Sequence, residues 1–454
     1  MEKLFKLKEH HTDVKTEVIA GITTFTTMAY ILAVNPNMLG DAGMDAGAVF
    51  TATALASFVA CLMMGLTANL PFALSAGMGL NAYFAYTICG QMGYSWHVAL
   101  AAVFVEGLLF ILLSLTNVRE AVFNAIPKTL KFAVSVGIGL FIAFSGLQNA
   151  HIVTDSTTLV SMFSFKASME AGTFRSEGIT VLLASAGVLI TAILLIKKVR
   201  GNILIGIGAT WILGIICQLT GLYVPDPDAG FYSLLPSGIF SMPASMAPTF
   251  LKMSFSGIGI MDFITIMLAL LFVDMFDTIG TVIGCAAKAD MLDEKGKLPE
   301  VRSILLSDAV GTTVGAVFGT STVTTFVESS AGIAHGGRTG LTTIVTGFLF
   351  LLSLFLSPIF LAVPSFATAP ALIIVGFMMM QQIVKIDMEE LSEAIPAFIT
   401  LIAMPFMYSI SAGISLGIIS YVGINLFIGK RERISPLMYV LTVLFVLKYM
   451  MLYS

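Results

Sequence analysis

The chain has 454 residues, of which 57% are hydrophobic and only 11% are charged. A soluble globular domain carries about 25% charged residues, so this chain has too few charges to cover a water-exposed surface. The 23 basic and 27 acidic residues leave a net charge of −4, which excludes the basic surface of a nucleic-acid-binding protein. The composition therefore predicts a multi-span membrane protein whose surroundings are the lipid bilayer and not nucleic acid.

Apolar runs of about 20 residues, the length that crosses a bilayer as a helix, divide the chain into two sets of seven. The first set covers 18–38, 47–66, 71–90, 98–117, 131–150, 178–197 and 202–221. The second set covers 260–284, 303–319, 321–337, 341–363, 367–384, 392–409 and 410–429. A more polar connector, 222–257, separates the sets. We therefore expect an all-α polytopic membrane protein with fourteen transmembrane segments.

Lysine and arginine residues cluster in alternate loops, and such clusters favour the cytoplasmic side of a membrane. The N-terminal tail, 1–17, is one of these clusters, and the segment Lys430–Arg433 is another. Both fall on one side of the membrane when 392–429 is split into two spans at Ser409–Gly413. We therefore expect both termini in the cytoplasm. The last apolar run, 438–453, is then expected to form a helix that lies in the interface or packs on a gate.

Spans three and ten share an interruption by small residues. Span three contains Ser75–Gly79 (SAGMG), and span ten contains Ser330–Ala334 (SAGIA). Because seven spans are an odd number, the second half is expected to be inverted relative to the first. Paired interrupted spans in inverted halves are typical of transporters with a site at the bilayer midplane.

Span ten is also rich in β-branched residues over Ser321–Val327, which favours a short extended strand. We expect a half-helix to begin near Glu328, with Ser329 or Ser330 as its capping residue. Non-helical backbone at this depth requires protein or a water-filled cavity around it. The alternative is an ordinary helix with a pore-lining glutamate.

Five acidic residues lie well inside the predicted spans, away from their ends, where charged side chains are costly and usually functional. They are Glu106, Asp274, Asp277, Asp308 and Glu328. Lysine and arginine are found only near the ends of the spans. Such carboxylates are suited to carrying a proton or to binding a neutral ligand rich in N–H donors.

The remaining candidate residues each have a structural alternative. Asp274 and Asp277 are three residues apart and lie on one helical face. They could carry a proton and bind substrate as a pair, or one of them could brace a neighbouring helix. Asn81 could bind a ligand or join two helices. Phe326 could stack on a planar ligand or pack in the core, and Met78 lies between the two glycines of span three.

Three motifs resemble the AzgA-like hypoxanthine/guanine/adenine permeases, a branch of the nucleobase–cation symporters in the xanthine/uracil permease superfamily. They are SAGMGLNAYFAY in span three, FVDMFDTIGT in span eight and TTFVESSAGIAHGGRTGLT in span ten. The resemblance extends from Gly21 to Gly429. It implies the uracil-permease-like fold, with fourteen transmembrane segments in a seven-plus-seven inverted repeat.

The resemblance also implies two domains that move against each other. The core domain would comprise 18–117 and 258–363 (spans 1–4 and 8–11), and the gate domain 118–221 and 364–429 (spans 5–7 and 12–14). An extracellular connector, 222–257, and a cytoplasmic C-terminal segment, 430–454, complete the chain. Members of the family are proton-coupled importers of the plasma membrane and are often homodimers through the gate domain.

Residue by residue, the resemblance makes Asp277 and Glu328 substrate contacts, Asp308 a supporting acid and Asn81 a polar residue near the site. It does not place Asp274 or Glu106, which remain candidates for proton coupling together with Asp277 and Asp308. Met78 and Phe326 are further candidates for substrate contact. Asp277 is shorter than the glutamate of the uracil and xanthine branches, which leaves room for a two-ring purine.

The sequence therefore predicts proton-coupled import of purine nucleobases by alternating access. The substrate is expected to be hypoxanthine or guanine, with adenine as a further candidate. No metal or cofactor is expected, and the coupling ion is a proton.

One alternative is a transporter of the same fold for another nucleobase, xanthine or uracil, and another is a transporter for an anion. An anion site would need a basic residue, and spans three and ten contain none before Arg338. A channel is a further alternative, whereas an intramembrane enzyme is not expected because the spans lack catalytic motifs.

Overall fold

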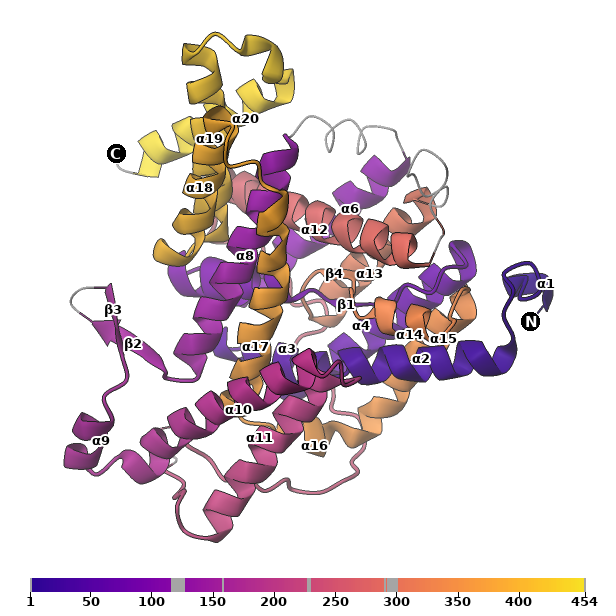
Figure 1. The fold of residues 1–454 in the computed structure, drawn as a ribbon, viewed down its shortest axis with the longest axis vertical. Helices are drawn as coiled ribbons and strands as arrows, with labels where there is room; N and C mark the ends of the chain where they lie inside the picture. The colour runs from indigo at the N-terminus through magenta and orange to yellow at the C-terminus, as the bar shows by residue number, and fades with distance from the viewer. Residues whose placement is uncertain are drawn as a thin grey trace.

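The computed structural model describes 2–115, 127–156, 159–226, 230–289, 291 and 301–452 (Figure 1). Ten helical stretches in this part of the chain are long and apolar enough to cross a membrane. The chain is therefore a helical, multi-pass membrane protein, as the composition predicts. A helix or an interrupted helix occupies each of the fourteen predicted spans, whereas the seven-plus-seven repeat stays a prediction.

The elements of the first half follow in chain order. They are α1 (Glu2–Phe5), α2 (Val14–Met28), α3 (Ile31–Asp41), α4 (Ala46–Thr67), β1 (Leu74–Ala76), α5 (Met78–Ala82), the π-helix η1 (Tyr83–Gln91), α6 (Trp96–Leu115), α8 (Lys128–Asn149), β2 (Val153–Ser156), β3 (Leu159–Met162), α9 (Phe165–Ala171), the π-helix η2 (Phe174–Gly178), α10 (Ile179–Ile196) and α11 (Asn202–Leu219).

The second half begins after the connector. Its elements are α12 (Ile260–Lys288), α13 (Val301–Phe318), β4 (Val323–Thr325), α14 (Ser329–Ala334), α15 (Gly340–Ser353), η4 (Leu354–Leu356), α16 (Ser357–Leu361), α17 (Ser365–Met380), η5 (Gln381–Lys385), α18 (Leu391–Phe406), α19 (Ile410–Phe427), η6 (Arg431–Arg433) and α20 (Pro436–Leu452).

The long helices pack in two groups. One group contains α2, α4, α6, α13 and α15, and the other contains α8, α10, α11, α17, α18 and α19. Each group combines helices from both halves of the chain. The first group packs very tightly in places, because a Cβ added to Gly340 would lie 2.1 Å from the carbonyl oxygen of Gly65. A glycine is therefore required where α15 meets α4.

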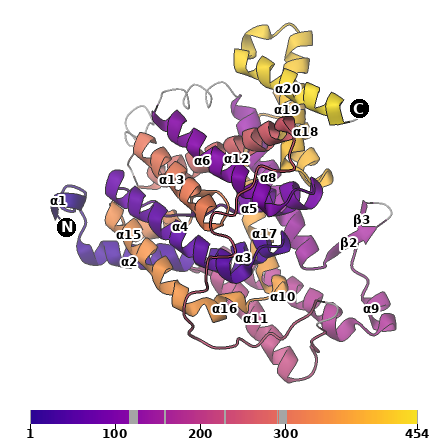
Figure 2. The same ribbon diagram turned by 180° about the vertical axis from the view of Figure 1, so that it is seen from behind.

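Two segments between helices have structure that the apolar pattern does not indicate. Between α8 and α10, the hairpin β2–β3 and helix α9 project from the helical body (Figure 1). The connector between α11 and α12 runs past α16 and α3 (Figure 2). It is anchored by hydrogen bonds from Thr51 to the carbonyl of Ala244 and from Thr249 to the carbonyl of Phe318.

The last apolar run forms α20, which packs against α19. The Ser415 and Tyr449 hydroxyls lie 2.7 Å apart across this contact. Whether this helix lies in the interface or packs on the gate domain stays a prediction.

Candidate functional site

The two interrupted spans meet through a pair of short strands. β1 and β4 are antiparallel, with Ser75 opposite Thr324. The N–H of Gly77 donates to the carbonyl of Thr322, and the N–H of Phe326 donates to the carbonyl of Ala73, so the pairing extends beyond both strands. These bonds satisfy non-helical backbone at membrane depth. The predicted strand in span ten is confirmed, and the ordinary helix is excluded.

A half-helix begins on each side of these strands, α5 at Met78 and α14 at Ser329. We call β1, β4 and the first residues of α5 and α14 the strand crossing. Gly77 is needed here because a Cβ would lie 2.8 Å from the Thr324 hydroxyl. The strands bring spans three and ten together at the depth where the sequence predicts a site.

The expected capping of α14 by Ser329 or Ser330 is wrong. No side chain caps the N-terminus of α14. The Ser329 hydroxyl instead accepts the N–H of Ala73 at 2.9 Å. That N–H lies just beyond β1 and is buried, and leaving it without an acceptor would be costly. Ser329 therefore joins span ten to span three.

Glu328 lies at the start of α14 and is partly exposed. The Tyr30 hydroxyl donates to Glu328 Oε1 at 2.8 Å. Tyr30 reaches this point because the first span is broken between α2 and α3, where the N–H groups of Leu32 and Ala33 bond to carbonyls three residues back. Sequence reasoning missed Tyr30, since one tyrosine in an apolar span has no distinctive spacing.

Asp277 on α12 is the second partly exposed acid of the site. It is close enough to interact electrostatically with both Tyr30 and Glu328. The structure thus brings together Asp277 and Glu328, the two residues predicted to contact substrate. Phe326 is buried beside them, with its ring centroid 6.5 Å from that of Tyr30. Its stacking on a ligand stays a prediction.

Asp274 and Asp308 are fully buried and flank one hydroxyl, that of Thr278. Thr278 Oγ1 lies 3.2 Å from Asp274 Oδ1 and 2.9 Å from Asp308 Oδ2. A hydroxyl carries one hydrogen and can donate to only one of the two carboxyl groups. The second contact is a hydrogen bond only when the other carboxyl is protonated. The arrangement can therefore hold a proton.

Glu106 and Asn81 bond to the two residues that precede β4. The Thr322 hydroxyl donates to Glu106 Oε2 at 2.7 Å, and the Ser321 hydroxyl donates to Asn81 Oδ1. All four side chains are buried. Asn81 therefore joins α5 to span ten, as the structural alternative predicts, and Glu106 fixes α6 to the same segment. Met78, the first residue of α5, is also buried.

The strand crossing contains no lysine or arginine. Arg338, the first basic residue after it, donates from its guanidinium to the carbonyls of Ile333 and Gly337 at the far end of α14. Its backbone N–H donates to Glu17. The charged side chains next to the crossing are therefore the acids Glu328, just before α14, and Asp277 on α12.

A protein-family model described as a permease family matches residues 15–416. The chain belongs to this family. It is 44% identical over 450 residues to the guanine/hypoxanthine permease PbuO of Bacillus subtilis, covering 97% of this chain and 98% of the relative. It is 41% identical over 449 residues to the adenine permease AdeP of Escherichia coli, covering 99% of this chain and 95% of the relative. The family and these relatives are transporters and not enzymes.

The solved transmembrane domain of the cyanobacterial bicarbonate transporter BicA has the same fold. Its TM-score is 0.63 at 16% sequence identity, and the match covers 88% of this chain and 97% of that domain. At this identity the likeness concerns the fold alone. It confirms the predicted fold class.

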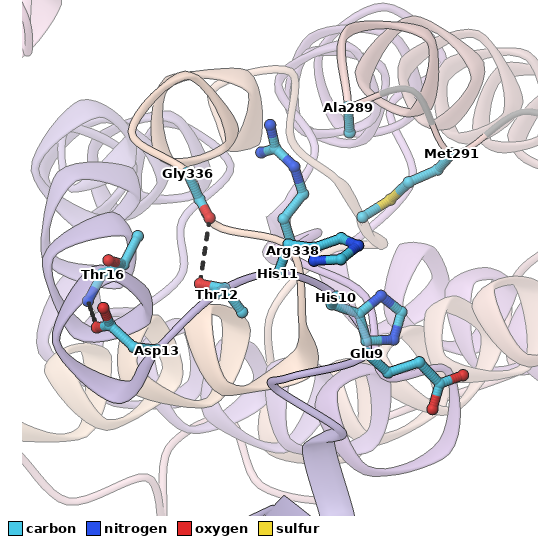
Figure 3. A pocket seen from close by; sticks show the side chains of 10 residues that line it. All are labelled: Glu9, His10, His11, Thr12, Asp13, Thr16, Ala289, Met291, Gly336 and Arg338. Carbon is cyan, nitrogen blue, oxygen red and sulfur yellow. Dashed lines mark hydrogen bonds between the residues drawn. The ribbon is translucent and has the colours of Figure 1, made fainter.

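The permease has a cavity of about 660 Å³ at the N-terminal end of α2 (Figure 3). Its lining residues are Glu9, His10, His11, Thr12, Asp13, Thr16, Ala289, Met291, Gly336 and Arg338. The Thr16 N–H donates to Asp13 and lowers the pKa of that carboxyl. None of the predicted site residues lines this cavity, so it is separate from the strand crossing.

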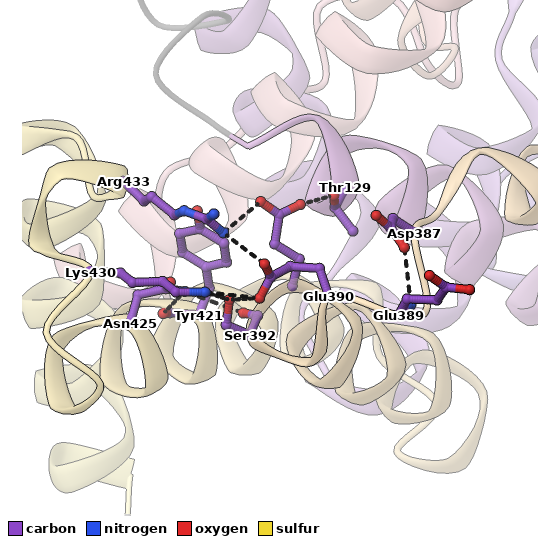
Figure 4. Close-up of polar contacts among 10 residues, drawn as sticks. Thr129, Asp387, Glu389, Glu390, Ser392, Tyr421, Asn425, Lys430 and Arg433 are labelled. Carbon is purple, nitrogen blue, oxygen red and sulfur yellow. Dashed lines mark hydrogen bonds and ion pairs between the residues drawn. The ribbon is translucent and has the colours of Figure 1, made fainter.

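A second group of acids lies where α18 begins (Figure 4). Lys430 Nζ is 3.0 Å from Glu390 Oε1, and Arg433 is 3.6 Å from both Glu390 and Glu393. The Ser392 hydroxyl and the Lys430 ammonium lower the pKa of Glu390 to about 2. We call Glu390, Glu393, Lys430 and Arg433 the α18 ion-pair cluster.

Proposed function

We propose that the permease imports purine nucleobases together with protons across the plasma membrane. Hypoxanthine and guanine are the proposed substrates, with adenine as a further candidate. The observation that carries the proposal is the pair of partly exposed acids, Asp277 and Glu328, beside a strand crossing without basic residues. Two carboxyl groups accept the N–H donors of a neutral base and would repel an anion. The names of the relatives support this substrate class.

In this proposal, Asp277 and Glu328 accept N–H groups of the purine, and Phe326 and Met78 form the apolar part of its surroundings. Asn81 and Glu106 hold the backbone before β4 in place through Ser321 and Thr322. The site residues thus rest on a second layer of buried hydrogen bonds. Such support keeps a binding geometry within the narrow limits that recognition requires.

Proton coupling is supported by the contact of Thr278 with both Asp274 and Asp308. A proton on one of these carboxyls completes both hydrogen bonds and removes one buried charge. When the proton leaves, one of the contacts loses its hydrogen. The protonation state is thereby linked to how α12 is held against α13, and α12 also carries Asp277.

Alternating access is supported by the two helix groups. The group with α4, α6, α13 and α15 corresponds to the core domain, 18–117 and 258–363, and the group with α8, α17, α18 and α19 to the gate domain, 118–221 and 364–429. Hydrogen bonds join them, from Asn149 Nδ2 to the Tyr86 hydroxyl at 2.7 Å and from Gln91 Nε2 to the carbonyl of Met407 at 2.8 Å. We propose that these bonds close one entrance and break in the other state.

The proposal further places both termini in the cytoplasm, following the basic loops, and pairs two permeases as a homodimer through the gate domain. These features follow from the positions of the lysine and arginine residues and from the family resemblance.

The test is uptake of radiolabelled hypoxanthine by cells that lack purine transport, with and without a protonophore. Guanine, adenine, xanthine and uracil serve as competitors. We expect saturable uptake that guanine blocks and the protonophore abolishes. Absence of uptake of every base, with the protein present in the membrane, would overturn the proposed function. Uptake that the protonophore leaves unchanged would overturn the proton coupling alone.

A further inference from the structure

Tyr30 is a fully buried tyrosine at the break of the first span, and it contacts a residue 298 positions away in the sequence. Its hydroxyl donates to Glu328 Oε1 at 2.8 Å. Its ring lies beside that of Phe326 at an angle of 46°. The side chain is therefore held from two sides, and its hydroxyl is directed at a carboxyl group that remains partly exposed.

We propose that Tyr30 is a positioning residue that makes Glu328 accept a single N–H of the purine and so sets the preference between purines. The proposal rests on the function proposed above and extends it. Tyr30 does not itself need to touch the base. It acts by occupying one oxygen of the carboxylate that does.

The chemical argument concerns the number of adjacent N–H donors. Guanine presents two on one edge, the ring N1–H and the exocyclic amine, and this pair matches both oxygens of a carboxylate. Hypoxanthine presents only the N1–H on that edge. A carboxylate with both oxygens available would favour guanine strongly, because bidentate contacts are the strong ones. The Tyr30 hydroxyl takes one lone pair of Oε1 and fixes the orientation of the carboxylate. In the proposal, this weakens the two-point contact with guanine, and the two bases bind with more equal affinity.

The burial of Tyr30 adds a second effect. A tyrosine ring has few rotatable bonds, and this one is fixed by its surroundings, so its hydroxyl holds Glu328 at little further cost in conformational entropy. The carboxylate is then oriented before substrate arrives. Preorganisation of this kind raises affinity without a new contact to the ligand.

The experiment measures KM for hypoxanthine and for guanine in the wild type and in Tyr30→Phe. We expect KM for hypoxanthine to rise about tenfold, because Glu328 is then no longer oriented before the substrate binds. We expect KM for guanine to change by less than about threefold, because the freed oxygen accepts the exocyclic amine. The preference then moves toward guanine. Unchanged KM values, or equal rises for both bases, would overturn the proposal.

The matched control is Tyr94→Phe. The Tyr94 hydroxyl also donates to a carboxylate, Asp262 Oδ2 at 2.6 Å, but at the edge of α12 and away from the strand crossing. We expect its KM values and its preference to equal those of the wild type. A shift in preference as large as that of Tyr30→Phe would show that loss of any such bond has this effect.

A second measurement covers the case in which Tyr30→Phe reaches the membrane poorly. Thermal stabilisation of the purified variant by hypoxanthine and by guanine reports binding without transport. We expect stabilisation by guanine to exceed that by hypoxanthine more than in the wild type. The proposal would be overturned if hypoxanthine and guanine stabilised the variant by the same amounts as they stabilise the wild type. Failure of the wild type itself to take up any purine would overturn the proposed function instead.

Discussion

At the strand crossing, Glu328 accepts a hydrogen bond from the Tyr30 hydroxyl, whereas at the start of α18 Glu390 accepts one from the Lys430 ammonium. In the α18 ion-pair cluster, cations stabilise the carboxylates in their charged form. At the strand crossing the Tyr30 hydroxyl donates to Glu328, and on α12 the Thr278 hydroxyl lies between Asp274 and Asp308. A hydroxyl can bond to a carboxyl in either protonation state. Glu328 can therefore change its charge without losing the hydrogen bond to Tyr30.

Replacing glutamate by glutamine at position 328 and at position 390 is expected to give the largest difference in transport activity between the two regions. We expect Glu328→Gln to lower the kcat/KM of hypoxanthine uptake by about 100-fold, because it replaces a charge-assisted hydrogen bond to the substrate by a neutral one. We expect Glu390→Gln to change it by less than about threefold, as for a surface ion pair. Uptake by membrane-verified variants measures both. Equal losses would remove the distinction between the two regions.

A substitution beside Thr278 tests whether these acids carry the proton. In Asp308→Asn, the amide group can donate to Thr278 without a proton, so we expect dependence on the proton gradient to be lost. The protonophore should change uptake by less than about twofold. Counterflow of hypoxanthine, which needs no gradient, should persist. Loss of counterflow together with uptake would indicate a structural role for Asp308.

The two helix groups also contain glycines that differ in how tightly they are packed, Gly340 on α15 and Gly423 on α19. Gly340→Ala places a methyl group against the backbone of Gly65, and we expect it to destabilise the protein by about 1–3 kcal/mol, as overpacking does. Gly423→Ala on α19 meets nothing within 4 Å, and it should be neutral or slightly stabilising, since alanine favours helix more than glycine. Thermal unfolding in detergent measures both. Similar melting temperatures would contradict the close approach of α4 and α15.

The smallest expected effect is the pH dependence of the α18 ion-pair cluster. The pKa of Glu390 is lowered from 4.5 to about 2, so its contribution to stability is present above pH 4.5 and is lost as the pH falls toward 2. The Tm of the wild type should exceed that of Glu390→Gln by no more than about 2 °C at pH 7. This difference should shrink as the pH is lowered to 3. A Tm difference between the wild type and Glu390→Gln that grows at low pH would contradict the lowered pKa of Glu390.

Much of the fold could be predicted from the sequence because bilayer thickness fixes the length of apolar runs. The strand in span ten followed from its β-branched residues, and the interruption of span three followed from its small residues. The pairing of the two strands was not predicted. The break between α2 and α3 left no such signal, because neither glycine nor proline stands at its two residues, Ala29 and Tyr30. The β2–β3 hairpin was also missed, since it lies outside the spans on which the prediction depended.

In the site, the acids were predictable because charge inside an apolar span is conspicuous. Their partners were not, because serine, threonine and tyrosine are common in spans. Thr278, Ser321 and Thr322 could be assigned to Asp308, Asn81 and Glu106 only from coordinates. The role of Ser329 was mistaken for the same reason, since the buried N–H that it satisfies belongs to a residue 256 positions earlier.

The pairing of β1 with β4 has a consequence for the synthesis of the protein. When β1 enters the membrane, the residues that will bond to its backbone have not yet been translated. Until β4 arrives, the N–H of Gly77 and the C=O of Ala73 lack the partners that Thr322 and Phe326 provide. The bilayer offers no hydrogen bonds in their place, at a cost of several kcal/mol for each group left unsatisfied. The first half is therefore an incomplete assembly that depends on a chaperone, on retained water or on the insertion machinery until the second half is made.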